Sequence, residues 1–98
     1  LEGEVIFHDQ FGNLITNISK SDLDEFEGKR GKSSGITKWQ VRIGPYRILG
    51  LKTSYDQGSE QDLSALVNSF NYLEIFLFKA SAWKFTQLQP HERVVVTF

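Results

Sequence analysis

Residues 4–18 read EVIFHDQFGNLITNI. The β formers from Glu4 to His8 predict a strand, and a second apolar run resumes at Leu14 and continues to Ile18. Between them stands the segment DQFGN, residues 9–13. It predicts a tight turn, because glycine reaches positive φ angles without steric cost. We therefore expect two extended segments joined at a sharp corner.

This corner gathers an acid, an aromatic ring and two amides within a few residues. A tight turn at Gly12 would let Phe11 and Asn13 point the same way. A purine ligand needs one group that stacks on its ring and one that bonds its edge. The alternative is a purely structural corner, with Phe11 in the core and Asn13 bonded to its own backbone. The residues alone favour the structural corner.

Length and composition indicate one small domain with an aromatic-rich core. The chain has 98 residues, including eight Phe, three Tyr and two Trp, which suits a single core. The net charge of −1 gives no basic footprint for nucleic acid. The absence of Cys excludes disulfides, thiol catalysis and thiolate metal ligands. The absence of Met leads us to expect a fragment of a longer protein.

We expect neither a membrane-spanning helix nor a signal peptide in these residues. No apolar run approaches the ~20 residues of a membrane-spanning helix, and no signal peptide opens the chain. We expect a cytoplasmic protein without a membrane partner.

Short segments rich in β formers recur along the chain, with turn signals between them. Residues 38–43 alternate, which places Trp39, Val41 and Ile43 on one face. The predicted strands are 3–8, 14–18, 38–43, 46–55, 63–67, 72–78 and 93–98. This pattern predicts an all-β barrel or sandwich. A small closed barrel is favoured, because closure removes exposed strand edges.

One or two short helices and a loop complete the prediction. Residues 19–26 suit a helix capped by Ser19 or Ser21. Residues 80–88 suit a second helix, with Phe85 among its core-facing side chains. Residues 28–35, GKRGKSSG, offer no apolar side chain and lack the spacing of a phosphate-binding loop. We expect a mobile loop at residues 28–35.

No catalytic or metal-binding constellation stands out. His8 and His91 are far apart in the sequence, and without cysteine a closed zinc site would need carboxylates at a spacing that the chain does not offer. We expect His91 to be exposed in a turn and His8 to pack or bond to backbone. Lys29, Arg30 and Lys32 form a basic cluster without interleaved aromatic residues, too little for a nucleic-acid site. We therefore expect no catalytic residue and no metal site.

Two motifs resemble those of a known enzyme family. Asp9–Ile18, DQFGNLITNI, is similar to the D-x-F-G-N-x-x-T-N-I motif of the S-adenosyl-L-methionine hydrolase (hydroxide adenosyltransferase) family, which also includes fluorinating and chlorinating enzymes. Residues 68–75, NSFNYLEI, are similar to its later S-x-G-Y-L-E-I strand. The segment TSY, residues 53–55, resembles the T-Y segment between them, with Ser54 as an extra residue. The segment KASA, residues 79–82, followed by Leu88 and the strand 94–96, resembles the family's terminal stretch. The motifs occur in the family's order and cover nearly the whole chain.

The resemblance implies that residues 1–98 are the C-terminal domain of a larger two-domain enzyme, a seven-stranded, Greek-key-like β-barrel. The family's enzymes hold S-adenosyl-L-methionine between the N-terminal α/β domain of one subunit and the C-terminal domain of its neighbour in a homotrimer. The implied partners are therefore the N-terminal domain, neighbouring subunits and a small nucleoside ligand. No cofactor is implied, since S-adenosyl-L-methionine is the substrate. The groups that activate water or bind halide lie in the N-terminal half, so we expect the fragment alone not to catalyse the reaction.

The resemblance also implies substrate-binding residues. Phe11 and Asn13 would contact the adenine, and Tyr55 would stack on it. Asp9 and Ser69 would hold the methionine end, with Asp9 accepting from the ammonium group. We expect these side chains at one rim of the barrel. Their polar atoms should be open to solvent, and Phe11 and Tyr55 should each expose a ring face.

The chain departs from the family pattern at three positions. Asn71 replaces a glycine, and asparagine tolerates the left-handed conformation better than other side-chain-bearing residues. Phe78 replaces an asparagine and Ala80 a glycine, so we expect a narrower adenine pocket. Two alternatives stay open. One is a non-catalytic barrel that has lost the ligand site and serves assembly. The other is an oligonucleotide-binding barrel, which fits the fold class but lacks a positive groove.

Overall fold

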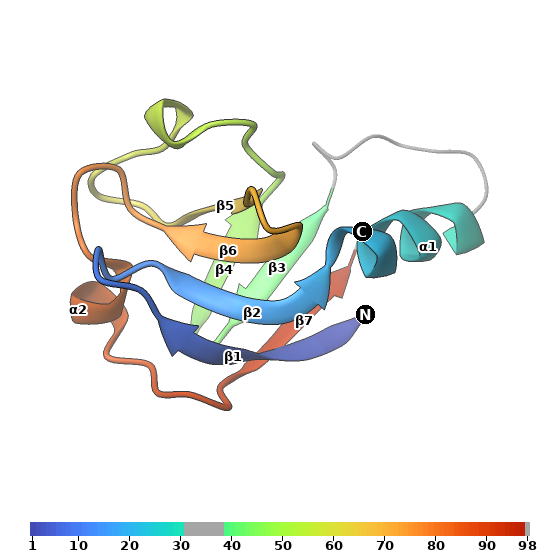
Figure 1. Cartoon of the computed structure of the whole chain (residues 1–98), viewed down its shortest axis with the longest axis horizontal. Coiled ribbons are helices and arrows are strands. Elements are labelled where there is room, and N and C mark those ends of the chain that lie inside the picture. The colour runs from blue at the N-terminus through green and yellow to red at the C-terminus, as the bar shows by residue number, and fades with distance from the viewer. Residues whose placement is uncertain (31–38, 98) are drawn as a thin grey trace.

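Seven strands and two α-helices account for most of residues 1–30 and 39–97, which are the residues that the computed structural model describes (Figure 1). The strands are β1 (Glu2–His8), β2 (Leu14–Ser19), β3 (Gln40–Ile43), β4 (Tyr46–Leu49), β5 (Ser64–Val67), β6 (Tyr72–Phe76) and β7 (Arg93–Thr97). The helices are α1 (Lys20–Arg30), α2 (Ala82–Thr86) and the short 3-10 helix η2 (Tyr55–Gln57).

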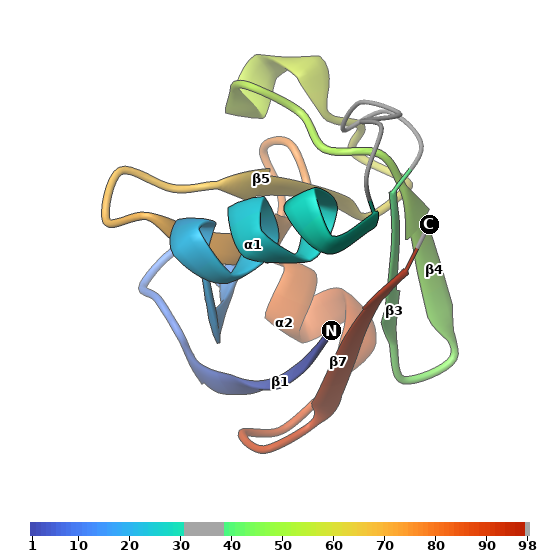
Figure 2. The ribbon, with the colours of Figure 1, turned by 90° about the vertical axis from the view of Figure 1, so that its right-hand side faces the viewer.

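The strands form one antiparallel sheet in the order β4-β3-β7-β1-β2-β6-β5. Figure 2 shows the sheet curving round on itself. Just after β4, Lys52 donates its backbone N–H to the carbonyl of Ala65 at 2.8 Å and bridges to Leu66 on β5. This contact brings the two edges of the sheet together. The prediction of an all-β barrel is confirmed, and the barrel is nearly closed.

The core lies inside the curved sheet, and every strand contributes to it. On β3 and just before it, Trp39, Val41 and Ile43 are buried, as their alternation predicts. The remaining core side chains are Val5, Leu14, Ile18, Leu23, Ile48, Ala65, Leu73, Ile75, Ala82, Val94 and Val96. A fully buried Val, Leu or Ile contributes about 1.5–3 kcal/mol relative to leaving it exposed, so this cluster is the main source of stability.

The two α-helices lie at opposite ends of the barrel (Figures 1 and 2). Ser19 caps α1 reciprocally with Asp22, because each side chain accepts the other's backbone N–H at 3.0 Å. Leu23 of this helix is buried in the core. α1 continues to Arg30, past the predicted end, so residues 28–30 are helical. The rest of the predicted mobile loop, residues 31–35, lies outside the described residues. No helix in the described part of the chain is long and apolar enough to cross a membrane.

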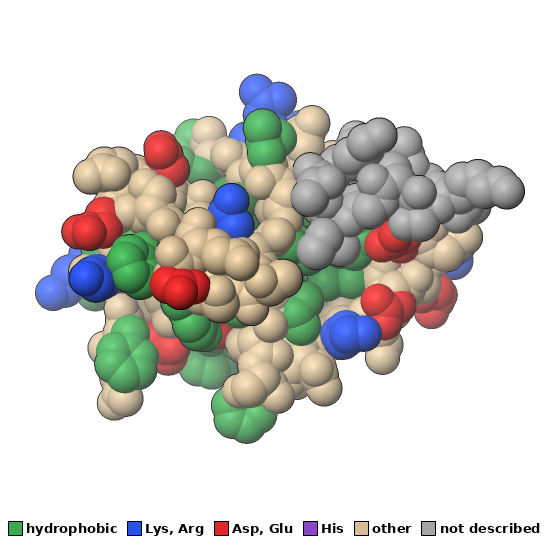
Figure 3. Space-filling model, turned by 90° about the horizontal axis from the view of Figure 1, so that it is seen from above, with side chains coloured by type: hydrophobic (Ala, Val, Ile, Leu, Met, Phe, Trp, Pro, Cys, Tyr) green, Lys and Arg blue, Asp and Glu red, His purple; other side chains and the backbone are tan. Residues whose placement is uncertain are grey.

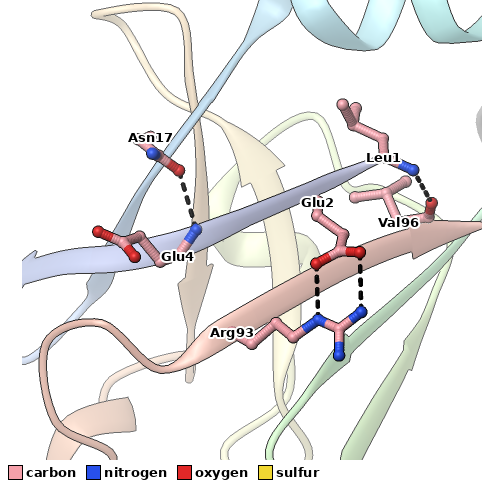
Figure 4. Close-up of polar contacts among 6 residues, drawn as sticks. All are labelled: Leu1, Glu2, Glu4, Asn17, Arg93 and Val96. Atoms are coloured by element: carbon pink, nitrogen blue, oxygen red, sulfur yellow. Dashed lines mark hydrogen bonds and ion pairs between the residues drawn. The ribbon is translucent and has the colours of Figure 1, made fainter.

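Side chains replace several hydrogen bonds where β2 leaves the regular ladder. Thr16 donates its hydroxyl to the carbonyl of Leu73 at 2.8 Å. Asn17 accepts the backbone N–H of Glu4 at 2.9 Å through its side-chain oxygen (Figure 4). The Thr-Asn pair of the first motif therefore has a structural role.

Figure 4 also shows Arg93 of β7 donating two hydrogen bonds of 2.7 Å to the carboxylate of Glu2 on β1.

Three predicted elements end earlier than their β or helix propensity suggests. The predicted strand 46–55 ends at Leu49, because Gly50 adopts a φ of +74° and turns the chain. The predicted strand 72–78 ends at Phe76, before the turn around Lys79, which has a φ of +58°. The second helix spans only Ala82–Thr86. Its Phe85 is not a core residue: it is 49% exposed.

Candidate functional site

Asp9 organises the corner between β1 and β2. Its Oδ1 accepts the backbone N–H groups of Phe11 and Asn13, both at 2.9 Å. Its carbonyl accepts the N–H of Gly12 at 2.9 Å, and its own N–H donates to the carbonyl of Asn13 at 3.0 Å. Four hydrogen bonds to one residue fix this turn, so the side chains that it carries have defined directions.

Phe11 and Asn13 leave the corner in different environments. Phe11 is 66% exposed, so the alternative that places its ring in the core is wrong. Asn13 is only 9% exposed, so the expectation that its polar atoms are open to solvent is also wrong. Its amide lies 3.4 Å from Oδ2 of Asp9, at the long end of a hydrogen bond. The corner presents an aromatic ring outward and holds its amide inside.

Two hollows adjoin this corner. The first, of about 540 Å³, is lined by Asp9, Phe11, Asn13, Tyr55, Leu77, Phe78, Lys79 and Ala80. The second, also about 540 Å³, is lined by Ile6, Phe7, Asp9, Ile15, Thr16, Tyr55, Asn68, Ser69, Phe70, Tyr72 and Glu74. Asp9 and Tyr55 line both. The five residues predicted from the motifs, Asp9, Phe11, Asn13, Tyr55 and Ser69, therefore border two neighbouring spaces with a shared wall.

Tyr55 is the first residue of η2 and lines both hollows. Its hydroxyl donates to Oε2 of Glu74 at 2.7 Å, and its ring meets the edge of Phe76 with centroids 5.0 Å apart. Partial burial raises the pKa of Tyr55 above its ordinary value, and the hydrogen bond to the Glu74 carboxylate raises it further. The phenol is therefore a neutral donor at physiological pH, and the residue is 45% exposed and lines both hollows.

Ser69 lies exposed in a turn that follows β5. The backbone carbonyl of Asn68 accepts the N–H of Asn71 at 2.9 Å. The side-chain oxygen of Asn68 accepts the N–H groups of Phe70 and Tyr72 at 3.0 and 3.1 Å. Asn71, which stands where the resembling family has glycine, adopts a φ of +69°. The asparagine thus takes the left-handed conformation expected of it.

The turn after β6 forms the far side of the first hollow. Phe78 is half-buried there and lies under the ammonium group of Lys79, which is 5.2 Å from its ring centroid. The backbone N–H of Phe78 donates to the carbonyl of Ser59 at 2.9 Å. The departures at Phe78 and Ala80 therefore both border the first hollow, where we expect them to narrow the space.

Exposed apolar side chains surround the second hollow. A register shift between Val5 and Phe7 marks a bulge in β1, and Ile6 and Phe7 are both exposed. Across the hollow, Phe70 is 81% exposed. Sequence reasoning did not find this surface, because an alternating pattern for β1 would bury every second side chain. It also missed Glu74, although an acid between two apolar strand residues is a usable signal.

Neither histidine lines a hollow. His8 is exposed and stacks on Trp83, with ring centroids 4.3 Å apart and planes 13° apart. His91 is exposed in a turn, as predicted, with Nδ1 3.0 Å from a carboxylate oxygen of Glu4. Among residues 1–30 and 39–97, no three His, Asp or Glu side chains gather in a way that could hold a metal ion.

Comparisons with known proteins place this geometry in a family. The model of the SAM hydroxide adenosyltransferase C-terminal domain matches residues 3–95. An uncharacterized conserved protein from Thermotoga maritima has a similar structure, with a TM-score of 0.74 and 21% identity over 99% of this chain and 35% of its own. A conserved hypothetical protein from Thermus thermophilus has a TM-score of 0.70 and 22% identity over 98% of this chain and 32% of its own.

These identities show a shared fold alone, and the chain spans about a third of the length of each solved structure. No curated protein shows a significant match to the chain. The family model, by contrast, covers nearly every residue, including both motifs and all five candidate side chains. The chain therefore belongs to the family of SAM hydroxide adenosyltransferase C-terminal domains.

Proposed function

We propose that this domain supplies one half of a nucleoside-binding site to an enzyme that hydrolyses S-adenosyl-L-methionine to adenosine and L-methionine. The observation that carries the proposal is the pair of hollows that meet at Asp9 and Tyr55. An elongated ligand with a flat end and a charged end suits two adjacent spaces better than a compact ligand does.

The first hollow would hold the adenine. Phe11 and Tyr55 offer ring faces for stacking, and both are exposed in the absence of a ligand. The amide of Asn13 lies in the lining between them and is the group proposed to meet the purine edge. Its burial means that the ligand would have to approach the corner closely.

The second hollow would hold the methionine end. Asp9 lines both spaces, and its Oδ2 has only the long contact with Asn13. That oxygen can accept from an ammonium group. Ser69 offers a hydroxyl from the exposed turn on the other side. The charged end would thus lie between a carboxylate and a hydroxyl.

In the proposed reaction, water attacks C5′ of the ribose. The C5′–S bond breaks, its electron pair goes to the sulfonium sulfur to give neutral methionine, and the water oxygen loses a proton as adenosine forms. This domain would contribute positioning: holding both ends of the substrate keeps the leaving sulfur in line with the attacking water. The water-activating group would come from an N-terminal α/β domain, and S-adenosyl-L-methionine would serve as substrate without a further cofactor.

A neighbouring subunit in a homotrimer is the proposed partner. Phe70, Ile6 and Phe7 are exposed beside the second hollow. Apolar side chains gathered at one place on a surface often mark an interface. The same surface supports the competing function, a barrel used only for assembly. An oligonucleotide-binding role is less well supported, because acidic and basic side chains are interspersed on the face that Figure 3 shows.

Adenosine titration into the isotope-labelled chain, followed by amide chemical shifts, tests the proposal. We expect shifts at Asp9, Phe11 and Tyr55 with weak affinity, roughly millimolar or worse, because only half of the ligand would be covered. Phe11→Ala should abolish the response. Phe85→Ala is the matched control, since it removes another exposed phenylalanine that lines neither hollow. If the domain serves only assembly, neither the parent chain nor Phe85→Ala should respond to adenosine.

A further inference from the structure

Glu74 carries an almost fully buried carboxylate, with 2% of the residue exposed. It lies on β6 between Leu73 and Ile75, whose side chains belong to the barrel core. Because side chains alternate along a strand, Glu74 faces away from that core, toward Tyr55 and Asn68. Burying an ionised carboxylate is costly unless hydrogen bonds satisfy it. Packing alone therefore does not explain an acidic residue at this position.

Each carboxylate oxygen of Glu74 accepts one hydrogen bond. Oε2 accepts the hydroxyl of Tyr55 at 2.7 Å, and Oε1 accepts the side-chain amide of Asn68 at 3.0 Å. Both donors are neutral, so the pair is not a salt bridge. The two donors come from η2 and from the turn after β5, which are separate segments of the chain. One carboxylate therefore joins two loops that border the hollows.

The orientation of the Asn68 amide follows from its other contacts. Its oxygen accepts the backbone N–H groups of Phe70 and Tyr72 at 3.0 and 3.1 Å, so its nitrogen must be the end that faces Glu74. A displacement of the Asn68 side chain would therefore also displace the turn that carries Ser69. The path runs from Tyr55 through Glu74 and Asn68 to that turn, with a hydrogen bond at every step.

We propose that Glu74 is a positioning residue, which sets the distance between the Tyr55 ring and the Ser69 turn so that one ligand can bind in both hollows at once. This inference rests on the proposed function, because it assigns Glu74 a task at that same site. Glu74 itself needs no contact with the ligand. Each of its oxygens already accepts one hydrogen bond from a residue that lines the second hollow, and it acts by holding these residues in place.

The state of the Tyr55 phenol gives an independent view of this bond. Burial raises the pKa of Tyr55 above its ordinary value, the hydrogen bond to Glu74 raises it further, and the charges of Glu74 and Asp9 act in the same direction. Loss of the Glu74 carboxylate should therefore lower the pKa of Tyr55 toward its ordinary value. The change can be followed without any ligand.

Glu74→Gln is the most informative substitution. A glutamine of nearly the same volume can still accept from Asn68 through its carbonyl oxygen. Its other end is an amide nitrogen, which cannot accept the Tyr55 hydroxyl hydrogen. The variant thus keeps the bond from Asn68 and removes both the negative charge and the bond that the Tyr55 hydroxyl donates. The contact left open to Tyr55 is a weaker one, in which the glutamine amide donates to the phenol oxygen. Tyr55→Phe tests the same bond from the opposite side and leaves the aromatic ring in place. Glu60→Gln is the matched control, because it removes an exposed carboxylate from a neighbouring loop.

Three measurements test the proposal: spectroscopic titration of the tyrosines in the proteins that keep Tyr55, amide hydrogen exchange at Phe70 and Tyr72, and the affinity for S-adenosyl-L-methionine, the ligand proposed to occupy both hollows. We expect Glu74→Gln to lower the Tyr55 pKa, to speed exchange in the turn, and to weaken S-adenosyl-L-methionine binding about fivefold, the scale of one typical hydrogen bond. Tyr55→Phe should weaken binding to a similar degree. Glu60→Gln should match the parent chain in all three.

A purely structural role would lower thermal stability while leaving the affinity of the folded molecules unchanged. An S-adenosyl-L-methionine affinity within twofold of the parent in Glu74→Gln would therefore overturn the proposal. If the parent chain does not respond to adenosine at all, the proposed function fails. The other two measurements then decide the positioning role by themselves: an unchanged Tyr55 titration and unchanged exchange in Glu74→Gln would overturn it.

Discussion

A Cβ atom added to Gly12 would lie 2.6 Å from Cβ of Ser81 and would overlap the Ser81 hydroxyl. The carbonyl of Gly12 accepts the backbone N–H of Trp83 at 2.8 Å. Ser81 in turn caps α2 by accepting the N–H of Lys84 at 3.0 Å. The corner between β1 and β2 is thus pressed against the start of α2. The corner can occupy this position only because Gly12 has no side chain.

Gly12→Ala should destabilise the chain by about 2 kcal/mol or more, because the φ of +82° is strained for alanine and the methyl group has no room. Gly28→Ala is the matched control. Gly28 lies in α1 with nothing within 4 Å of an added Cβ, so alanine there should stabilise by about 0.5–1 kcal/mol. Urea denaturation measures both. Equal effects at the two positions would contradict the packing of the corner on α2.

Asn13→Ala should cost about 1 kcal/mol or more, because the side chain is buried and its amide contacts the Asp9 carboxylate. Gln10→Ala removes an exposed amide from the same corner and should change stability by less than about 0.5 kcal/mol. Thermal unfolding of the two variants provides the comparison. If Asn13→Ala were as mild as Gln10→Ala, the corner would owe its shape to Asp9 and Gly12 alone.

The strands were predictable wherever local pattern and burial agree. Trp39, Val41 and Ile43 alternate in the sequence and are buried in the structure. Prediction failed where a single backbone angle ends an element. The β formers of residues 46–55 continue past Gly50, yet the chain turns there and Tyr55 lies in a 3-10 helix. Local propensity cannot report which strand is available as a hydrogen-bonding partner.

The candidate site likewise has features that the sequence predicts and features that it does not. The motifs predict a site that includes Asp9 and Tyr55, and these two residues line the same two hollows although they are far apart in the sequence. The exposure of Asn13 was not predictable, because burial there depends on how the corner packs on the rest of the barrel. The same holds for Glu74, whose carboxylate is buried only because η2 and the turn at Asn68 fold over β6. Long-range packing, rather than local pattern, decides both.

Alkaline pH should expose the contribution of Tyr55 to stability. The folded pKa of Tyr55 is raised, so the folded state keeps the phenol proton at pH values where the unfolded chain releases it. The contribution is fully present below the unfolded pKa of about 10 and is lost as pH rises toward the folded value. We therefore expect the stability advantage of the parent chain over Tyr55→Phe to shrink above pH ~10. Denaturant unfolding at several pH values measures it, and a constant difference would contradict the bond to Glu74.

The described chain should not release adenosine from S-adenosyl-L-methionine. The carboxylates that line the two hollows belong to Asp9 and Glu74. Both oxygens of Glu74 accept hydrogen bonds, and Oδ1 of Asp9 accepts two backbone N–H groups. The remaining Asp9 oxygen, Oδ2, is the one proposed to hold the ammonium group of the substrate, so we expect neither carboxylate to take a proton from water. Neither histidine lines a hollow. We expect the rate of adenosine formation, followed by chromatography, to equal the rate without protein. Faster release that Asp9→Asn abolishes would show that this half of the site contains a base of its own.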